Sequence, residues 1–364
     1  MIAKATAREC MMQVYRSQLP ERIPVAIYSR YLPRGSAERL ARNLGLGIID
    51  YFPLVSMLAP PWHMNAGYLS RVKGADCNIA YAWENNQLVE IRSFDTPLGT
   101  VSQRTRKDPA YGSDWVQKFY ISNVEDYKIV QYLVENTIFH SNSNEFNARQ
   151  QDLAEDGVLL ARLDRSPYQK LLIELAGAER FMVDLQTNPE PVLALLRALE
   201  LRMEEVVDRV CESKAEVVWL PDNITSDMTP PTMFEKYCLP YYIKLAEELH
   251  HSKKLLVVHM DGRLRALKGA IARSPIDAVE SFSLPVVGGN LEIAEARSAW
   301  PGKVILPNFP SPLATADEQT IRKFVEKLVE DMGANTPFML QVSEDIPPKS
   351  WQNLLPLLCR AIGG

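Results

Sequence analysis

Short apolar runs of strand type alternate with longer stretches of helical periodicity over the second half of the chain. Rich in β-branched and aliphatic residues, the runs predict strands at Val217–Leu220, Leu255–His259, Ile276–Phe282, Val304–Leu306 and Phe338–Val342. Between them, apolar residues recur every three or four positions, which predicts helices at about 191–210, 232–250, 318–332 and 351–361. Strands that alternate with helices in this way indicate a parallel sheet covered by helices.

The first half of the chain supplies two more strands and one interruption. Runs at 23–28 and 47–51 are of strand type, whereas two alternating runs between about Asp76 and Thr105 flank Asn85-Asn86 and predict an antiparallel hairpin. We find no repeat or long linker, and expect one domain over residues 1–364, a (β/α)8 TIM barrel of the α/β class with an N-terminal extension and a β-hairpin insertion. A doubly wound open sheet is disfavoured, because no Gly-rich phosphate loop follows any strand.

Composition narrows the class of protein. The 364 residues carry a formal net charge of -5, so the sequence has no basic footprint for nucleic acid. No run approaches the roughly 18 apolar residues of a membrane helix, and the start lacks the apolar stretch of a signal peptide. Five widely spaced cysteines without a CxxC are typical of reduced thiols. We expect a cytoplasmic protein with neither a nucleic-acid nor a membrane partner; its oligomeric state is not indicated.

Three of the predicted C-terminal strands end in side chains that can bind a metal. One ends in His259 and is followed by Asp261, the next carries Glu280, and the last leads to Glu344. Because a barrel collects its active site at the carboxyl ends of its strands, one His and several carboxylates can converge there. A further strand ends before Asp222 and Asn223. We do not expect these two residues to bind the metal; they are candidates for holding substrate or for contacting His259.

Each of these residues also has a structural interpretation. His259 can be a buried His bonded to a backbone carbonyl, and Asp261 can cap the helix expected near Leu264. Glu344 can be a surface residue, whereas an unpaired Glu280 inside an apolar strand would be costly, which favours a ligand role. The stretch Pro61-Trp-His-Met64 can line a substrate pocket or pack as a loop.

Several stretches together resemble the uroporphyrinogen decarboxylase superfamily, and the resemblance covers most of the chain. They are Pro20–Val25, Thr96–Thr100, Val124–Tyr127, Pro231–Phe234 with Cys238–Tyr242, and His259–Gly262. The second and third look like signatures of the methyltransferase branch, and the last occupies the family's "H-x-C-G" position. The resemblance implies a TIM barrel, in agreement with the alternating pattern.

The decarboxylase branch of that superfamily is less similar to this chain. Its opening segment carries arginines that hold the many carboxylates of the substrate. The comparable stretch here, 26–34, keeps Tyr-Leu-Pro but lacks the double-Arg arrangement, so a polyanionic porphyrinogen would be poorly held. A decarboxylase of this superfamily that works without cobalamin remains the alternative function, and a non-catalytic barrel is a third.

The resemblance to the other branch implies a zinc-dependent methyltransferase that works with a corrinoid protein. The family's His and two Cys ligands become His259, Asp261 and Glu344, and Glu280 falls about where related cobalamin-independent methionine synthases add a Glu. A His with carboxylates makes zinc a harder Lewis acid, suited to oxygen. We therefore expect the first methyltransferase of an O-demethylase system, which takes a methyl group from a methyl ether such as a methoxylated aromatic.

The methyl acceptor implied by the resemblance is the Co(I) of a separate corrinoid protein. No "D-x-H-x-x-G" segment of the kind that binds a corrinoid occurs in the sequence. Cobalamin is therefore expected on the partner protein rather than on this chain.

Overall fold

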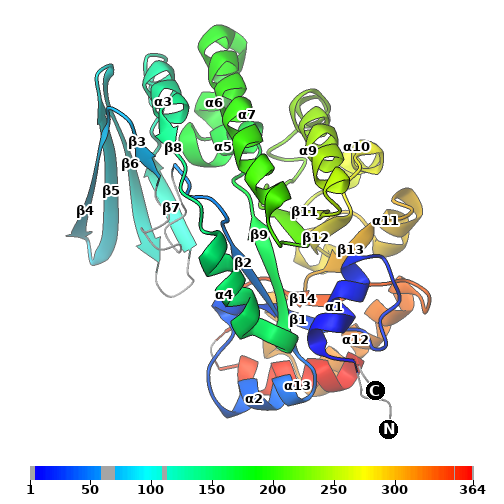
Figure 1. Ribbon diagram of the computed structural model, residues 1–364. Helices are drawn as coiled ribbons and strands as arrows, with labels where there is room; N and C mark the ends of the chain where they lie inside the picture. The colour runs from blue at the N-terminus through cyan, green and yellow to red at the C-terminus, as the bar shows by residue number, and fades with distance from the viewer. Residues whose placement is uncertain (1–4, 59–69, 109–112, 348, 363–364) are drawn as a thin grey trace. The chain divides into compact units, whose positions relative to one another are not determined.

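The computed structural model describes residues 5–58, 70–108, 113–347 and 349–362 (Figure 1). The chain divides into two compact units. The first comprises Met1–Phe52, Asn144–Arg162 and Lys214–Gly364, and the second comprises Pro53–Ser143 and Leu163–Ser213. Within the described ranges, no helix is long and apolar enough to cross a membrane.

Eight parallel strands form one sheet in the first unit. Across the sheet their order is β13 (Val304–Pro307), β12 (Ala278–Phe282), β11 (Leu255–His259), β10 (Val217–Leu220), β9 (Gly157–Arg162), β2 (Gly47–Phe52), β1 (Val25–Tyr28) and β14 (Leu340–Val342). A single bridge between Asn308 and Gln341 joins the two edge strands, so the sheet is nearly closed into a barrel. The predicted α/β TIM-barrel fold is confirmed.

Helices stand between consecutive strands of the barrel, as the sequence predicts. In the first unit they include α2 (Ser36–Asn43), α9 (Leu239–His251), α10 (Lys268–Arg273), α11 (Ile293–Ala299), α12 (Glu318–Met332) and α13 (Trp351–Ile362), with α4 (Ser143–Leu153) before β9. A short α8 (Pro231–Met233) and a π-helical turn, η5 (Phe234–Cys238), lead into α9 and together account for the predicted helix at 232–250. α12 begins at the predicted residue because the Asp317 side chain caps it by accepting from Thr320 N–H.

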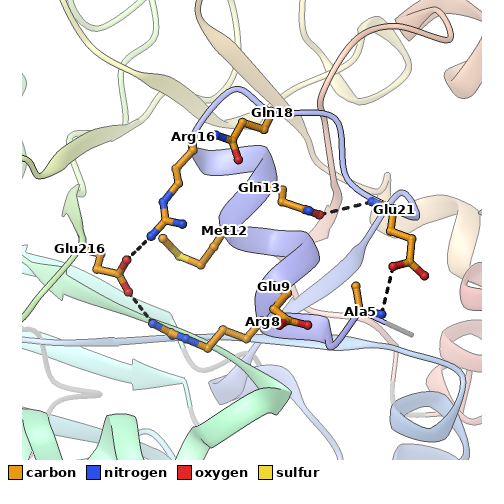
Figure 2. Close-up of a pocket in the computed structure, with 9 residues that line it drawn as sticks. All are labelled: Ala5, Arg8, Glu9, Met12, Gln13, Arg16, Gln18, Glu21 and Glu216. Atoms are coloured by element: carbon orange, nitrogen blue, oxygen red, sulfur yellow. Dashed lines mark hydrogen bonds and ion pairs between the residues drawn. The ribbon is translucent and has the colours of Figure 1, made fainter. Parts of the chain in front are cut away.

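The N-terminal helix α1 (Ala7–Tyr15) packs at the amino ends of the barrel strands. Its buried residues Met11, Met12, Val14 and Tyr15 belong to the same core cluster as inward-facing residues of seven barrel strands and Met339, the residue before β14. Arg8 reaches the carbonyl of Gly157, the first residue of β9, and both Arg8 and Arg16 pair with Glu216 just before β10 (Figure 2). The predicted N-terminal extension therefore forms part of the barrel core.

The second unit contains the predicted hairpin. β4 (Asp76–Glu84) and β5 (Gln87–Thr96) pair antiparallel, and Asn85 and Asn86 have φ of 49° and 60°, as a two-residue primed turn requires. The insertion is larger than predicted, because β6 (Gly99–Asp108) and β7 (Ser113–Lys118) extend the hairpin to a four-stranded sheet. Also in this unit are the short strands β3 (Arg71–Val72) and β8 (Thr137–Ile138), and the helices α3 (Asp126–Glu135), α5 (Pro167–Lys170), η4 (Leu171–Leu175), α6 (Ala178–Thr187) and α7 (Pro189–Glu212).

Candidate functional site

His259 and Glu280 lie side by side at the carboxyl ends of neighbouring strands. They are paired in register between β11 and β12. Since side chains alternate along a strand, His259 continues the inward row that contains Val257. Its Nδ1 lies 2.6 Å from Oε2 of Glu280, which is 0 % exposed. The pairing therefore joins a ring nitrogen to a carboxylate that is out of contact with solvent.

Glu280 accepts further hydrogen bonds from two other strands. The hydroxyl of Tyr28 on β1 donates to Oε1 at 2.5 Å, and the indole N–H of Trp219 on β10 donates to Oε2 at 3.2 Å. Burial, reinforced by the negative charge of Glu280, raises the pKa of Tyr28 well above its ordinary value, so its phenol keeps the proton that it donates. These donors offset the cost of burying a carboxylate in the barrel.

The second ring nitrogen of His259 is directed towards Asp261. Nε2 lies 3.8 Å from Oδ2 of Asp261, and the side chains are 12 % and 34 % exposed. Burial opposes protonation of His259, but the neighbouring carboxylates of Glu280 and Asp261 outweigh it and raise its pKa to about 10. Without a metal, the imidazole is therefore a cation between two carboxylates.

Glu344 joins this group from the segment after β14. Burial raises the pKa of its carboxyl, the charge of Asp261 raises it further, and the charge of His259 opposes the change. The side chain of Asn308 accepts from the backbone N–H of Ser343, the residue before Glu344, at 3.0 Å, which holds the end of β14. The structure thus brings together all four residues that the sequence singles out as metal ligands, His259, Asp261, Glu280 and Glu344.

The four side chains do not have the same surroundings. Glu280 is engaged through both oxygens by three donors, whereas Nε2 of His259 lies 3.8 Å from Asp261, and Glu344 interacts with both residues through its charge. This nitrogen and these oxygens are donors that suit zinc or a similar divalent cation. Within the part of the chain that the structure describes, no three His, Cys, Asp or Glu side chains stand in a metal-binding arrangement. The donor chemistry of His259, Asp261 and Glu344 nevertheless suits a divalent cation, and Glu280 lies behind the His.

Asp222 and Asn223, the other predicted site residues, lie after β10. Asp222 is fully buried, and its Oδ2 accepts from the hydroxyl of Tyr242 at 2.7 Å, which connects it to α9. Asn223 is exposed and has a left-handed φ of 53°. Asp222 therefore contacts the helix α9 through Tyr242. The stretch at 61–64 lies outside the described residues.

The sequence analysis did not predict the group of aromatic side chains beside His259. The ring centroids of Tyr51 and Trp219 are 4.8 Å apart, and Trp219 meets Tyr28 and His259 edge-on at 6.1 Å and 6.0 Å. Arg162 packs against the same rings. Each of these residues lies near the carboxyl end of a barrel strand. Period-2 alternation, continued from the apolar residues before them, was the signal that could have placed them inward.

Comparisons with known proteins agree with this architecture. The family model for uroporphyrinogen decarboxylase (URO-D) matches residues 170–361. No curated protein matches the chain. Among solved structures, a methyltransferase from Methanosarcina mazei is similar with a TM-score of 0.57 and 12% identity, over 98% of this chain and 98% of its own. At that identity the similarity establishes the fold alone.

A second solved structure is more distant. A protein from Listeria monocytogenes described as a vitamin-B12-independent methionine synthase has a TM-score of 0.41 and 14% identity, over 61% of this chain and 69% of its own. A similarity at that level supports no argument about the site.

Proposed function

The chain belongs to the uroporphyrinogen decarboxylase family, whose match covers more than half of it, and we propose that it is a zinc-dependent methyltransferase. The proposed reaction moves a methyl group from an O-methyl donor, a methoxylated aromatic, to the Co(I) of a separate corrinoid protein. This places the chain in the O-demethylase branch of its superfamily. The observation that carries the proposal is the set of His259, Asp261 and Glu344 at the carboxyl ends of the barrel strands.

The donors in this set favour a reaction at oxygen. A metal bound by one imidazole nitrogen and two carboxylates is a harder Lewis acid than a metal bound by thiolates. When bound, zinc would polarise the ether oxygen of the methyl donor and stabilise the negative charge that develops on it. A phenolate is the leaving group that such a site suits best.

The contribution of Glu280 is to fix the His. Its bond to Nδ1 fixes the orientation of the His259 ring and turns Nε2 towards Asp261. Tyr28 and Trp219 hold the Glu280 carboxylate in turn, so the ring is oriented before any ligand binds. The partly exposed ring of Tyr51, packed against the buried Trp219, offers a flat surface that suits an aromatic donor.

The atoms and charges of the proposed reaction balance without an oxidant. The bond between the methyl carbon and the ether oxygen breaks, and its electron pair stays on the oxygen, which becomes a phenolate and takes a proton from water. The Co(I) of the partner supplies the electron pair of the new cobalt–carbon bond and becomes methyl-Co(III). The partner must therefore carry a reduced corrinoid, and the chain itself is expected to carry none.

The test is a spectroscopic assay of cobalt methylation with a panel of methyl ethers. The purified protein alone should be inert, and a reduced corrinoid protein should yield methyl-Co(III) and free phenol in equal amounts. His259→Ala should abolish both products and the bound zinc. The matched control is His250→Ala, because His250 also pairs with a carboxylate, Asp277, at 2.8 Å, but lies on an outer helix.

Two results would contradict the proposal. Failure with every ether, together with release of carbon dioxide from an acid substrate in the absence of cobalamin, would favour the decarboxylase alternative. Retention of zinc and activity by His259→Ala would show that the site lies elsewhere.

A further inference from the structure

β4 forms one edge of the four-stranded sheet in the second unit (Figure 1). It pairs with β5 along its whole length without a bulge, and no strand among the described residues pairs with its other side. Proteins usually protect such an edge with a lysine, a proline or a bulge, because its outward backbone groups can bind another strand. β4 contains none of these, and its charged residues, Asp76 and Glu84, stand at its two ends. Its outer side is therefore suited to pairing.

The two-residue turn after β4 determines which backbone groups point outwards. In such a hairpin the residues that flank the turn, here Glu84 and Gln87, exchange both of their hydrogen bonds. Every second residue from Glu84 back along β4 therefore bonds to β5. The residues between them, Ile79, Tyr81 and Trp83, direct their N–H and C=O groups away from the sheet. The outer side of β4 thus carries a regular row of donors and acceptors.

Two large aromatic side chains stand at the same edge. Trp83 is 75 % exposed and Tyr81 is 61 % exposed. Successive residues of a strand alternate between the two faces of a sheet, and paired residues share a face. Tyr81 and Trp83 therefore lie on the face that is packed around the buried Phe94 and Val101. Aromatic rings left in solvent beside a packed apolar face indicate a surface that another chain covers.

We propose that β4 pairs with β4 of a second copy of this chain, antiparallel and centred on Tyr81, so that the two four-stranded sheets become one continuous sheet. In this register Tyr81 faces its own counterpart, Trp83 faces Ile79, and Glu84 faces Asn78. Aromatic and aliphatic side chains then stand opposite one another, and no like charges do. The outward-directed residues would exchange about six backbone hydrogen bonds. The inference does not depend on the proposed function.

The ends of β4 favour this register over its two neighbours. Centring the pair on Ala80 would place Glu84 directly opposite Asp76 of the other copy, and like charges in facing positions are destabilising. Centring it on Ala82 would pair only residues 80–84, because the turn follows β4 at once. The register centred on Tyr81 therefore gives the longest pairing in which no two carboxylates face each other.

The experiment is sedimentation equilibrium of the full chain over a range of concentrations. The wild-type protein should show a monomer–dimer equilibrium with a dissociation constant in the micromolar range, because one strand from each copy makes a small interface. Tyr81→Lys should weaken the dimer roughly 10-fold or more, since two lysines would face each other in place of an aromatic pair. Tyr81→Glu should weaken it similarly. An equimolar mixture of the two variants should recover the dimer, because lysine then faces glutamate.

The matched control is Trp115→Lys. Trp115 is 60 % exposed on β7, the opposite edge of the same sheet, so this variant should keep the wild-type dissociation constant. A wild-type protein that stays monomeric at every concentration would overturn the proposal, as would a dimer that Tyr81→Lys leaves intact. Failure of the mixed variants to recover the dimer would overturn the pairing centred on Tyr81.

The same variants identify a different partner if there is one. A monomeric wild-type protein whose methylation of a reduced corrinoid protein is slowed by Tyr81→Lys, and not by Trp115→Lys, would show that β4 binds the corrinoid protein. Pairing between two copies of this chain would then be wrong, and the proposed function would stand.

Discussion

The Nδ1 atom of His259 lies 2.6 Å from a carboxylate oxygen of Glu280 that no solvent reaches. The pair connects two adjacent strands of the barrel, and the carboxylate is held by donors from two more. The orientation of the imidazole is therefore determined by the core of the barrel rather than by a loop. A ring fixed in this way presents Nε2 in one direction, which is what a metal ligand or an acid–base group needs.

Glu280→Gln should weaken zinc binding by roughly 10- to 100-fold without abolishing it, because the residue positions His259 rather than binding the metal. The amide would present an NH2 group to the donors that now surround a carboxylate. Competition with a chelator measures the affinity. His259→Ala, Asp261→Ala and Glu344→Ala should lose zinc, and Asp222→Asn, bonded to Tyr242, should not. Complete loss in Glu280→Gln would instead identify Glu280 as a direct ligand.

The stability of the metal-free protein should fall as the pH rises from about 6.5 to about 10. The pKa of His259 is raised from 6.5 to about 10, so over this interval the folded state holds a proton that the unfolded state has lost. The stabilisation is complete below pH 6.5 and is lost through pH 10, with a slope of at most about 1.4 kcal/mol per pH unit. Urea denaturation at a series of pH values measures the slope, and His259→Gln should flatten it. An equal slope in that variant would assign the titration to another group.

Gly157→Ala should destabilise the barrel by roughly 1–3 kcal/mol, because no side chain fits where β9 meets β2. An added Cβ would lie 1.9 Å from the backbone oxygen of Ile48, which is too close for any contact. Gly269→Ala is the control, since its Cβ would meet nothing nearer than the end of Arg273 at 3.9 Å on α10. Urea denaturation should show a loss of stability only in the first variant. Equal stability of the two would show that β2 and β9 can move apart at no cost.

The sequence was most informative where local pattern decides the structure. β11 and α12 occupy the predicted residues, because an apolar run and a capped amphipathic stretch each specify their own limits. In the second unit, the predicted hairpin proved to be half of a sheet. The Thr96–Gly99 stretch, which resembles a family signature, is also a turn. Thr96 pairs with Gly99 across this turn, at the ends of β5 and β6.

The residues that contact the site residues could not be predicted from the sequence. Tyr28 and Trp219 reach Glu280 from positions 252 and 61 residues away, and no local pattern reports which inward side chains meet inside a barrel. The position of Asp222 after a strand makes it a site candidate. Its bond to Tyr242 depends on the rotation of α9, which hydrophobic periodicity does not fix to one residue.

The single bridge that joins β13 to β14 makes one edge of the barrel different from the rest. Strands β10, β11 and β12, which carry Trp219, His259 and Glu280, are paired along their lengths, whereas β14 is bridged at Gln341 to Asn308, the residue after β13. Backbone amides at that seam should exchange with solvent at a lower opening free energy than those of β11. Each such opening would detach the segment that bears Glu344 while His259 stays in place. The site would then alternate between a complete and an incomplete set of ligands on the timescale of local opening.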